Sequence, residues 1–157
     1  MTGYMLDTNI FNRVLDGQVR IDVLQGRILF ATHIQLKELR RTKCETRRMQ
    51  LVALFRHLKP RKIRTSTWFY GEDAIGEGLW ASGDGVYERM LKRLEELDRE
   101  AGKRPKGARR LNQSRDVRIA ETAIKHGLTV VTTDPQLLKL IPEFGGRAIT
   151  LDQFQRL

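Results

Sequence analysis

Short apolar strands alternate with helices along this chain, and that alternation constrains the fold more than any other feature. Candidate strands lie at residues 4–6, 27–31 and 128–131, and residues 148–150 form a candidate edge strand. Helical patterns of apolar residues follow the first three strands. We therefore expect an α/β fold with three α/β/α layers, in which helices cover both faces of a mostly parallel sheet.

Capping residues predict the helix boundaries in the first third of the chain. Thr8 or Asn9 is expected to cap the first helix, and Gly17 is expected to stop it. Thr32 and Gln35 have the spacing of a capping box, in which two side chains satisfy the free N–H groups of a helix start. We expect the helix that they open to continue as far as Leu58.

The last third of the chain contains two further helix signals. Ser114 is expected to cap a helix that ends at His126. Asp134 precedes a proline, a pair of residues typical of a helix start, and Pro142 is expected to end that short helix. The apolar strand at residues 128–131 lies between these two helices.

The middle of the chain is less regular. Five glycines lie at uneven spacing between residues 71 and 85, and an amphipathic helix is expected over residues 87–97. Residues 99–115 contain seven Lys or Arg and one acid, together with two glycines and a proline. This composition favours a flexible basic loop.

Composition limits the kind of protein and the kind of partner. The chain has 157 residues, which suits one domain, and its 40% apolar content is typical of a globular protein. Its net charge is +10, which favours a polyanionic partner because phosphates release counterions when they are neutralised. An inert basic surface is the alternative.

Further sequence features indicate a cytoplasmic protein without a membrane partner. Cys44 is the single cysteine, so an internal disulfide is excluded. No segment approaches the roughly 20 apolar residues that cross a bilayer, and we expect no signal peptide. Three histidines show no metal-ligand spacing with one another or with Cys44, and a zinc site is therefore not expected.

Four acids are expected to meet at one edge of the sheet. Asp7 and Asp134 follow strands directly, Glu38 lies in the helix after the second strand, and Asp116 is expected in the first turn of a helix. Ligands of such sheets bind beyond the carboxyl ends of the strands. Clustered carboxylates repel one another, and a hard divalent cation such as Mg²⁺ or Mn²⁺ relieves that repulsion. This chemistry suits the hydrolysis of phosphodiesters.

Each acid also has a purely structural explanation. Asp7 and Asp134 are suited to cap helices. A first-turn position would let Asp116 interact with the helix dipole, which is worth about 0.3–1 kcal/mol. Glu38 can pair with Arg41 or with Thr42 on the helix surface. The functional interpretation therefore depends on the four acids occurring together.

Four segments of the chain resemble the acidic motifs of PIN-domain nucleases, in the order of that family. They are residues 5–10 (MLDTNI), 36–39 (LKEL), 116–123 (DVRIAETA) and 130–134 (VVTTD). The resemblance implies a PIN-like fold with a five-stranded, mostly parallel sheet. It also implies Mg²⁺ or Mn²⁺ at Asp7, Glu38, Asp116 and Asp134, with Thr8, Asn9 and Thr132 as supporting groups, and endonucleolytic cleavage of RNA.

Many bacterial members of this family are VapC-type toxins, which an antitoxin inhibits and which are often dimeric. The resemblance therefore implies RNA as substrate, an antitoxin as a possible partner and a homodimer. The chain departs from the compact toxin pattern in its middle. We expect a single PIN domain over residues 1–157, with a helical and basic-loop insertion at about 71–113.

Basic and aromatic residues near the middle of the chain are candidates for RNA binding. Trp68, Phe69 and Tyr70 are suited to stack on bases or to line a dimer interface, although core packing is expected for at least two of them. A solvated charge run is the alternative for the basic set. The candidates for phosphate contacts are Lys103, Arg104, Lys106, Arg109, Arg110 and Arg115.

Two other functions compete with RNA cleavage. The first is a catalytically silent PIN-like module that binds RNA or protein, although the presence of all four acids argues against it. The second is a phosphotransferase with Asp7 as its nucleophile. Asn9 stands where haloacid-dehalogenase-type enzymes would place a second Asp, which disfavours that function.

Overall fold

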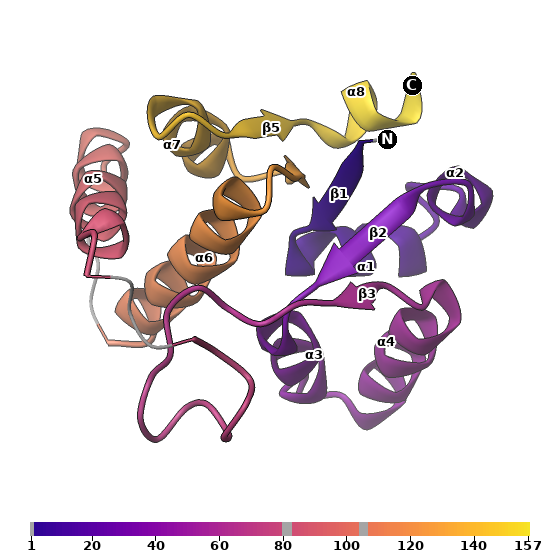
Figure 1. The fold of residues 1–157 in the computed structure, drawn as a ribbon. Helices are drawn as coiled ribbons and strands as arrows, with labels where there is room; N and C mark the ends of the chain where they lie inside the picture. Colours follow the sequence, from indigo (N-terminus) through magenta and orange to yellow (C-terminus); the bar gives the residue numbers. More distant parts are fainter. Residues whose placement is uncertain (1, 80–82, 104–106) are drawn as a thin grey trace.

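Five parallel strands form the central sheet of this computed structural model, which describes residues 2–79, 83–103 and 107–157 (Figure 1). Their order across the sheet is β3-β2-β1-β4-β5, and every neighbouring pair is parallel. The strands are β1 (Gly3–Leu6), β2 (Ile28–Ala31), β3 (Arg61–Lys62), β4 (Thr129–Val131) and β5 (Arg147–Ile149). The expected parallel α/β sheet is confirmed, and it is parallel throughout.

Eight helices surround this sheet in the described part of the chain. They are α1 (Thr8–Leu15), α2 (Ile21–Gln25), α3 (His33–Arg40), α4 (Glu45–Leu58), α5 (Val86–Glu100), α6 (Ala108–Lys125), α7 (Pro135–Glu143) and α8 (Leu151–Gln155). None of the described helices is long and apolar enough to cross a membrane.

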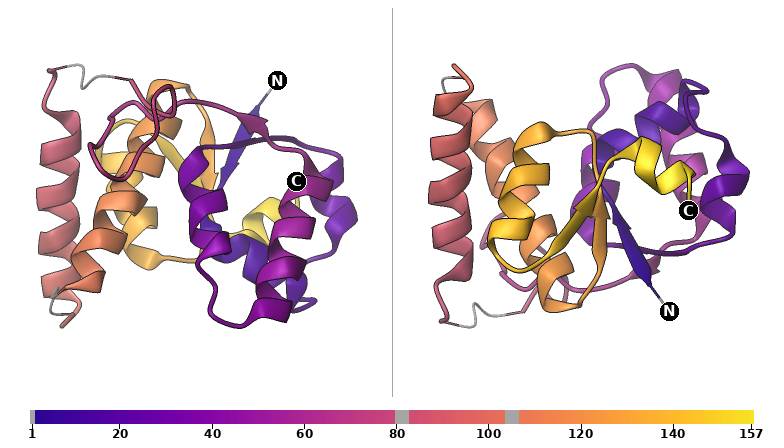
Figure 2. Two further views of the ribbon diagram at one scale, coloured as in Figure 1. Left: turned by 90° about the horizontal axis from the view of Figure 1, so that it is seen from below. Right: turned by 90° about the horizontal axis from the view of Figure 1, so that it is seen from above.

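Two apolar clusters, one on each face of the sheet, make the three layers. Side chains of α5, α6 and α7 build the first cluster, and side chains of α1, α2, α4 and α8 build the second (Figure 2). Strand β1 shows the alternation directly, because Met5 belongs to the first cluster whereas Tyr4 and Leu6 belong to the second. The expected three-layer arrangement is therefore confirmed.

The long helix expected from residue 33 to residue 58 is wrong, because the chain forms two helices there. Thr32 and Gln35 make the predicted capping box at the start of α3. That helix ends at Arg40, and α4 begins at Glu45 after a short link. Residues 40–48 include no aliphatic or aromatic side chain, so no apolar stripe holds them against the sheet.

The helix start expected at Ser114 is also wrong. Helix α6 begins at Ala108, so Ser114 lies inside it and Asp116 is not in its first turn. Polar contacts to α5 hold the added turns: Tyr87 and Ser114 share a hydrogen bond of 2.9 Å, and the Gln113 amide donates to Asp98. A search for apolar periodicity does not detect such contacts.

The end of α7 and the form of the basic segment also differ from the expectation. Pro142 lies inside α7, which continues to Glu143, and the basic segment expected as a loop over 99–115 is helical at both ends. Helix α5 packs against α6 and α7 at the side of the molecule (Figures 1 and 2). A single PIN domain with an insertion at about 71–113 stays a prediction.

Candidate active site

The carboxyl edge of the sheet carries acids from four separate segments of the chain. Asp7 follows β1, and Asp134 follows β4, the neighbouring strand. Glu38 lies on α3, the helix that follows β2. Asp116 lies near the middle of α6, the helix that precedes β4. Strands β2 and β3 extend the sheet on one side of β1, and β4 and β5 extend it on the other. Where the strand order reverses in this way, a crevice forms at the carboxyl ends of the strands, and ligands bind there.

Electrostatic coupling shows that these acids lie close together. Burial raises the pKa of Asp116 well above its ordinary value of 3.8, and the negative charges of Asp7, Glu38, Asp134 and, least, Asp98 raise it further. Such repulsion falls with distance. The other three acids therefore lie within electrostatic range of Asp116, although no three of the four bring carboxylate oxygens within 4.8 Å of one another.

Asp7 is the most enclosed of these carboxyl groups. It is 6% exposed, and burial raises its pKa to about 6, against the opposing effect of a hydrogen bond from Thr132. The Thr132 hydroxyl donates to Oδ2 of Asp7 over 2.6 Å. Asp7 is the N-cap residue of α1, but its side chain makes no capping hydrogen bond. The structural explanation for this acid is therefore weakened.

Glu38 points back toward the first helix. Burial raises the pKa of Glu38, while a hydrogen bond from Thr8 and the charge of Arg41 lower it. The Thr8 hydroxyl donates to Oε2 of Glu38. Glu38 is thus attracted by the charge of Arg41 without a direct bond, and its direct hydrogen-bond partner is Thr8 of α1.

Asp134 has the structural role that its sequence position predicted. Its Oδ1 accepts a hydrogen bond of 2.7 Å from the backbone N–H of Gln136, which caps α7. Its own N–H donates to the hydroxyl of Thr132 over 3.0 Å. Thr132 therefore contacts the carboxylate of Asp7 and the backbone of Asp134.

The donor atoms at this edge fit a hard divalent cation. All are oxygens, and Oδ1 of Asn9 is buried without a hydrogen-bond partner. No three of the four acids bring one carboxylate oxygen each within 4.8 Å of one another. A cation here would accordingly be held by fewer direct ligands, with water molecules completing its shell, as Mg²⁺ commonly requires.

A second cluster of possible ligands lies beside the first and was missed by the sequence analysis. His33, Asp73 and Glu77 bring their ligand atoms within 4.8 Å of one another, close enough to hold a metal ion. Protein cations already neutralise the two acids, because Asp73 pairs with Arg118 and Glu77 pairs with Lys37. The cluster therefore serves as an ion-pair network in this structure.

Three members of the predicted RNA-binding set have side chains that the structure describes. Lys103 pairs with Asp98 over 3.8 Å, Arg110 is exposed in the first turn of α6, and Arg115 is only 9% exposed. Arg104, Lys106 and the side chain of Arg109 lie outside the described residues. Contact of this set with RNA stays a prediction.

The aromatic triplet divides between core and surface. Phe69 packs against the first apolar cluster, and Arg118 lies over its ring at 4.8 Å from the centroid. Trp68 is half-buried, and Tyr70 is 92% exposed. Core packing therefore applies to Phe69, whereas Tyr70 is free to meet a partner.

Comparison with solved structures identifies the architecture. No family model matches this chain, and no curated protein does. A structure of VapBC2 from Rickettsia felis bound to a promoter DNA fragment matches with a TM-score of 0.53 and 18% identity, covering 96% of this chain and 100% of that one. DNA-bound VapBC from Salmonella typhimurium gives a TM-score of 0.52 at 18% identity, covering 96% and 98%.

The chain has a PIN-like fold. At this level of identity the likeness concerns the fold alone. Within the PIN-like fold, the acids of this chain occupy the sheet edge where Asp7 and Asp116 repel each other. The expected resemblance in architecture is confirmed over nearly the whole chain.

Proposed function

We propose that this protein is a metal-dependent endoribonuclease, with Asp7, Glu38, Asp116 and Asp134 as its metal-binding and catalytic residues. The observation that carries the proposal is the position of these four acids at the carboxyl edge of the sheet, where the charges of Asp7, Glu38 and Asp134 raise the pKa of the buried Asp116 carboxyl group. Buried like charges are costly unless a cation or a proton neutralises them. Mg²⁺ or Mn²⁺ is the proposed cofactor, since both prefer oxygen donors.

Each side chain has a distinct part in this proposal. Asp7, Glu38 and Asp116 would hold the cation, in part through its water ligands, and the bound cation would polarise the phosphate and promote ionisation of the attacking water. Asp134 supports it from the α7 cap, where Gln136 orients its carboxylate. The water oxygen attacks phosphorus, the bond from phosphorus to the 3′-oxygen breaks, and the leaving 3′-oxygen takes a proton. The products carry 5′-phosphate and 3′-hydroxyl ends.

The supporting groups orient these ligands. Thr132 holds Asp7, and Thr8 holds Glu38, each through its hydroxyl. Asn9 contributes a buried oxygen that lacks a donor in the protein and that a cation or its water would satisfy. Preorganised ligands of this kind avoid a reorganisation cost when the substrate binds.

Cleavage of a labelled single-stranded RNA with Mg²⁺, with Mn²⁺ or with EDTA tests the proposal. We expect Asp7→Asn and Asp116→Asn to reduce metal-dependent cleavage by at least a hundredfold. Asp152→Asn, an exposed acid on α8, is the matched control and should keep full activity. Mn²⁺ binding is measured by the loss of the electron paramagnetic resonance signal of the free ion. This binding should weaken in the same two variants only. Full cleavage by Asp7→Asn would refute the assignment.

We further propose an antitoxin partner and a homodimer for this chain. The support is that the structures with the same fold are VapBC complexes. Gel filtration with light scattering measures the dimer. Co-expression with the product of an adjacent small gene, followed by a cleavage assay, tests inhibition by an antitoxin.

A catalytically silent module that binds RNA or protein is the second candidate. Its support is the spacing of the acids, which places no three carboxylate oxygens within 4.8 Å. It predicts RNA binding without any metal-dependent cleavage, and no change in the Mn²⁺ signal. The same assays therefore separate the two candidates.

A further inference from the structure

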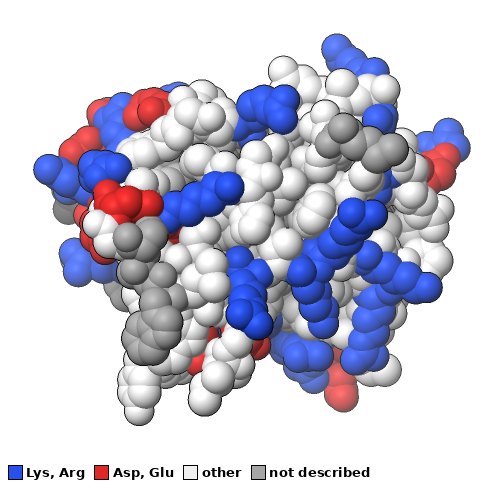
Figure 3. All heavy atoms as spheres, viewed as in Figure 1, with Lys and Arg blue, Asp and Glu red and all other residues white. Residues whose placement is uncertain are grey.

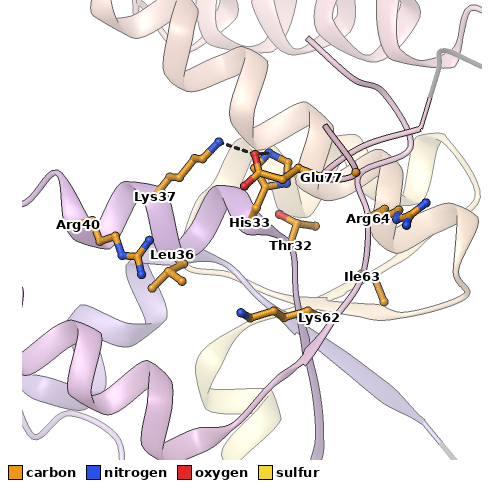
Figure 4. A pocket seen from close by; sticks show the side chains of 10 residues that line it. Thr32, His33, Leu36, Lys37, Arg40, Lys62, Ile63, Arg64 and Glu77 are labelled. Carbon is orange, nitrogen blue, oxygen red and sulfur yellow. Dashed lines mark hydrogen bonds and ion pairs between the residues drawn. The ribbon is translucent and has the colours of Figure 1, made fainter. Parts of the chain in front are cut away.

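A basic cavity opens beside the proposed active site, between α3 and the segment that follows β3. Its volume is about 370 Å³, and its lining includes Leu36, Lys37, Arg40, Lys62 and Arg64. Figure 4 shows Arg40 and Lys62 reaching toward this space from α3 and from β3, while Lys37 turns away to pair with Glu77. Two cations therefore face the open part of the cavity.

A second hollow continues this surface along α3 and α4. It has a volume of about 580 Å³, and Arg40 lines both hollows. Arg48 and Arg56 contribute the other charges, over a floor made by Val52 and its neighbours. We call the residues Arg40, Arg48, Arg56 and Lys62 the basic track. Figure 3 shows the same face, with Lys and Arg side chains gathered over α3, α4 and β3.

Most charges of the basic track are not neutralised by the protein. Among the described residues, Arg40, Arg56 and Lys62 have no ion-pair partner and are exposed. Some cations elsewhere are paired, since Arg47 binds Asp16 and Arg93 binds Glu143. An exposed run of unpaired cations leaves a positive potential that attracts a polyanion.

Exposed aromatic side chains lie next to the first cavity. A hollow of about 690 Å³ is lined by Trp68 and Tyr70, and it shares Gly76 with the cavity that Arg40 and Lys62 face. The two rings contact each other edge to face at 6.1 Å, and Tyr70 is 92% exposed. Aromatic rings beside a basic groove are typical of proteins that bind single-stranded nucleic acid, where bases stack and phosphates pair with cations.

We propose that single-stranded RNA binds along the basic track, with its phosphates on Arg40, Arg56 and Lys62 and a base on Tyr70. This inference rests on the proposed function for the identity of the polyanion. Helix α3 carries both Arg40 and the acid Glu38, which lie two positions apart and therefore face different sides of that helix. The track is a candidate RNA path in addition to the basic segment at residues 103–115, of which Lys103 is paired and Arg115 is buried.

The test is the affinity of the full chain for a fluorescein-labelled 12-nucleotide RNA, measured by fluorescence anisotropy in EDTA so that no cleavage occurs. The track variant is Arg40→Gln/Arg56→Gln/Lys62→Gln. The control variant, Lys92→Gln/Lys139→Gln/Arg156→Gln, removes the same charge from exposed positions on α5, α7 and just after α8. Thermal melts verify that both fold, and the single variant Lys62→Gln provides a milder change.

We expect the track variant to bind at least tenfold more weakly, and the control less than twofold more weakly. Three lost phosphate contacts should also lower the slope of log affinity against log salt by about 2, and Lys62→Gln should lower it by about 0.7. Tyr70→Ala should weaken binding about fivefold or more without changing that slope, because stacking releases no counterions.

Equal binding by the track and control variants would overturn the inference. Displacement of the RNA from the wild-type chain by polyglutamate of equal charge, as effectively as by unlabelled RNA, would also overturn it in favour of an acidic protein partner. The two proposals fail separately. If the wild-type chain cleaves RNA and the track variant binds RNA normally, only the proposed binding path is refuted. If RNA binding depends on the track but the wild-type chain does not cleave RNA, only the proposed nuclease activity is refuted.

Discussion

Thr132 and Asp7 join the ends of two neighbouring strands by a hydrogen bond of 2.6 Å, although 125 positions separate them in the chain. The same hydroxyl accepts from the N–H of Asp134 over 3.0 Å. Because Thr132 is fully buried, water cannot replace it as a partner of the Asp7 carboxylate. One threonine thus bonds to the carboxylate of one acid and to the backbone of another.

Replacing Thr132 with valine should raise the pKa of Asp7 above its value of about 6, because the hydroxyl favours the charged carboxylate. A larger fraction of Asp7 would then be protonated at neutral pH. We expect about a tenfold loss of metal-dependent RNA cleavage at pH 7, since a hydrogen bond to a charged group is worth about 1.5–3 kcal/mol. Carbon-13 titration of the Asp7 carboxyl group measures the shift.

Thr132→Ser is the control for this prediction, since it keeps the hydroxyl. It should retain most of the activity and an Asp7 pKa near that of the wild-type chain. If the valine variant titrates like the serine variant, the hydroxyl does not control the charge of Asp7.

The pH dependence of stability follows from the same group. The pKa of Asp7 is raised from 3.8 to about 6 in the folded protein, so the folded state binds a proton more tightly than the unfolded chain. The resulting stabilisation is fully present below about pH 4 and is lost as the pH rises through about 6. Its size is on the order of 3 kcal/mol. Burial gives Glu38 and Asp116 shifts of the same sign.

Thermal melts in EDTA from pH 4.5 to pH 7.5 should therefore show a steeper decline for the wild-type chain than for Asp7→Asn, which cannot ionise. At pH 7.5 the variant should be the more stable of the two. Mg²⁺ should stabilise the wild-type chain at pH 7.5 and have little effect at pH 4.5. Parallel curves for both chains would contradict the assigned shift.

Gly146, directly before β5, tests how tightly the chain packs against α6 and α7. A Cβ atom there would lie 2.6 Å from Cγ1 of Ile124 and 2.7 Å from Cγ2 of Ile141, a side chain that is fully buried. Gly146→Ala should lower the free energy of unfolding by about 1–3 kcal/mol through overpacking. Gly26→Ala is the control, because nothing lies within 4 Å of its Cβ position and its φ is −79°.

Urea denaturation measures both glycine variants. Gly26→Ala should be neutral or stabilising by up to about 1 kcal/mol, because alanine restricts the unfolded chain. An equal loss in both variants would show that chain flexibility, rather than packing at Gly146, sets the effect.

Local patterns in the sequence were sufficient to predict four of the five strands, β1, β2, β4 and β5, whereas β3 (Arg61–Lys62) was not predicted. Apolar runs predict β1 and β4, and the capping signals of Thr32 and Asp134 hold in the structure. These features depend on neighbours within a few positions. The early start of α6 could not be predicted in this way, because a contact to α5, from Gln113 to Asp98, supports it.

One signal for that contact was present in the sequence. Asp98 occupies a place on the apolar stripe of α5, beside Leu94 and Leu97, and all three are buried. An acid on a buried stripe requires a partner, which indicates a second helix packed against it. The partners of Asp73 had no comparable signal, because that acid lies in an irregular glycine-rich segment.

Arg118 and Asp73 form the most buried ion pair among the described residues. Both side chains are 1% exposed, and Arg118 also donates to the carbonyl of Thr67 over 3.2 Å. Arg118→Met would leave the Asp73 carboxylate buried without this charge. We expect a loss of about 3–5 kcal/mol in the free energy of unfolding, measured by urea denaturation. Arg110→Met, at an exposed position of the same helix, should cost little.

A double-mutant cycle separates the pair from the packing of its side chains. Arg118→Met/Asp73→Leu removes both charges, so it should cost clearly less than the sum of the two single variants. Leucine cannot replace the bonds that Asp73 makes to the N–H of Phe69 and to His33, so a part of the loss should remain. Additive losses would mean that Arg118 and Asp73 act independently, and that the segment around Asp73 is held to α6 by its other contacts.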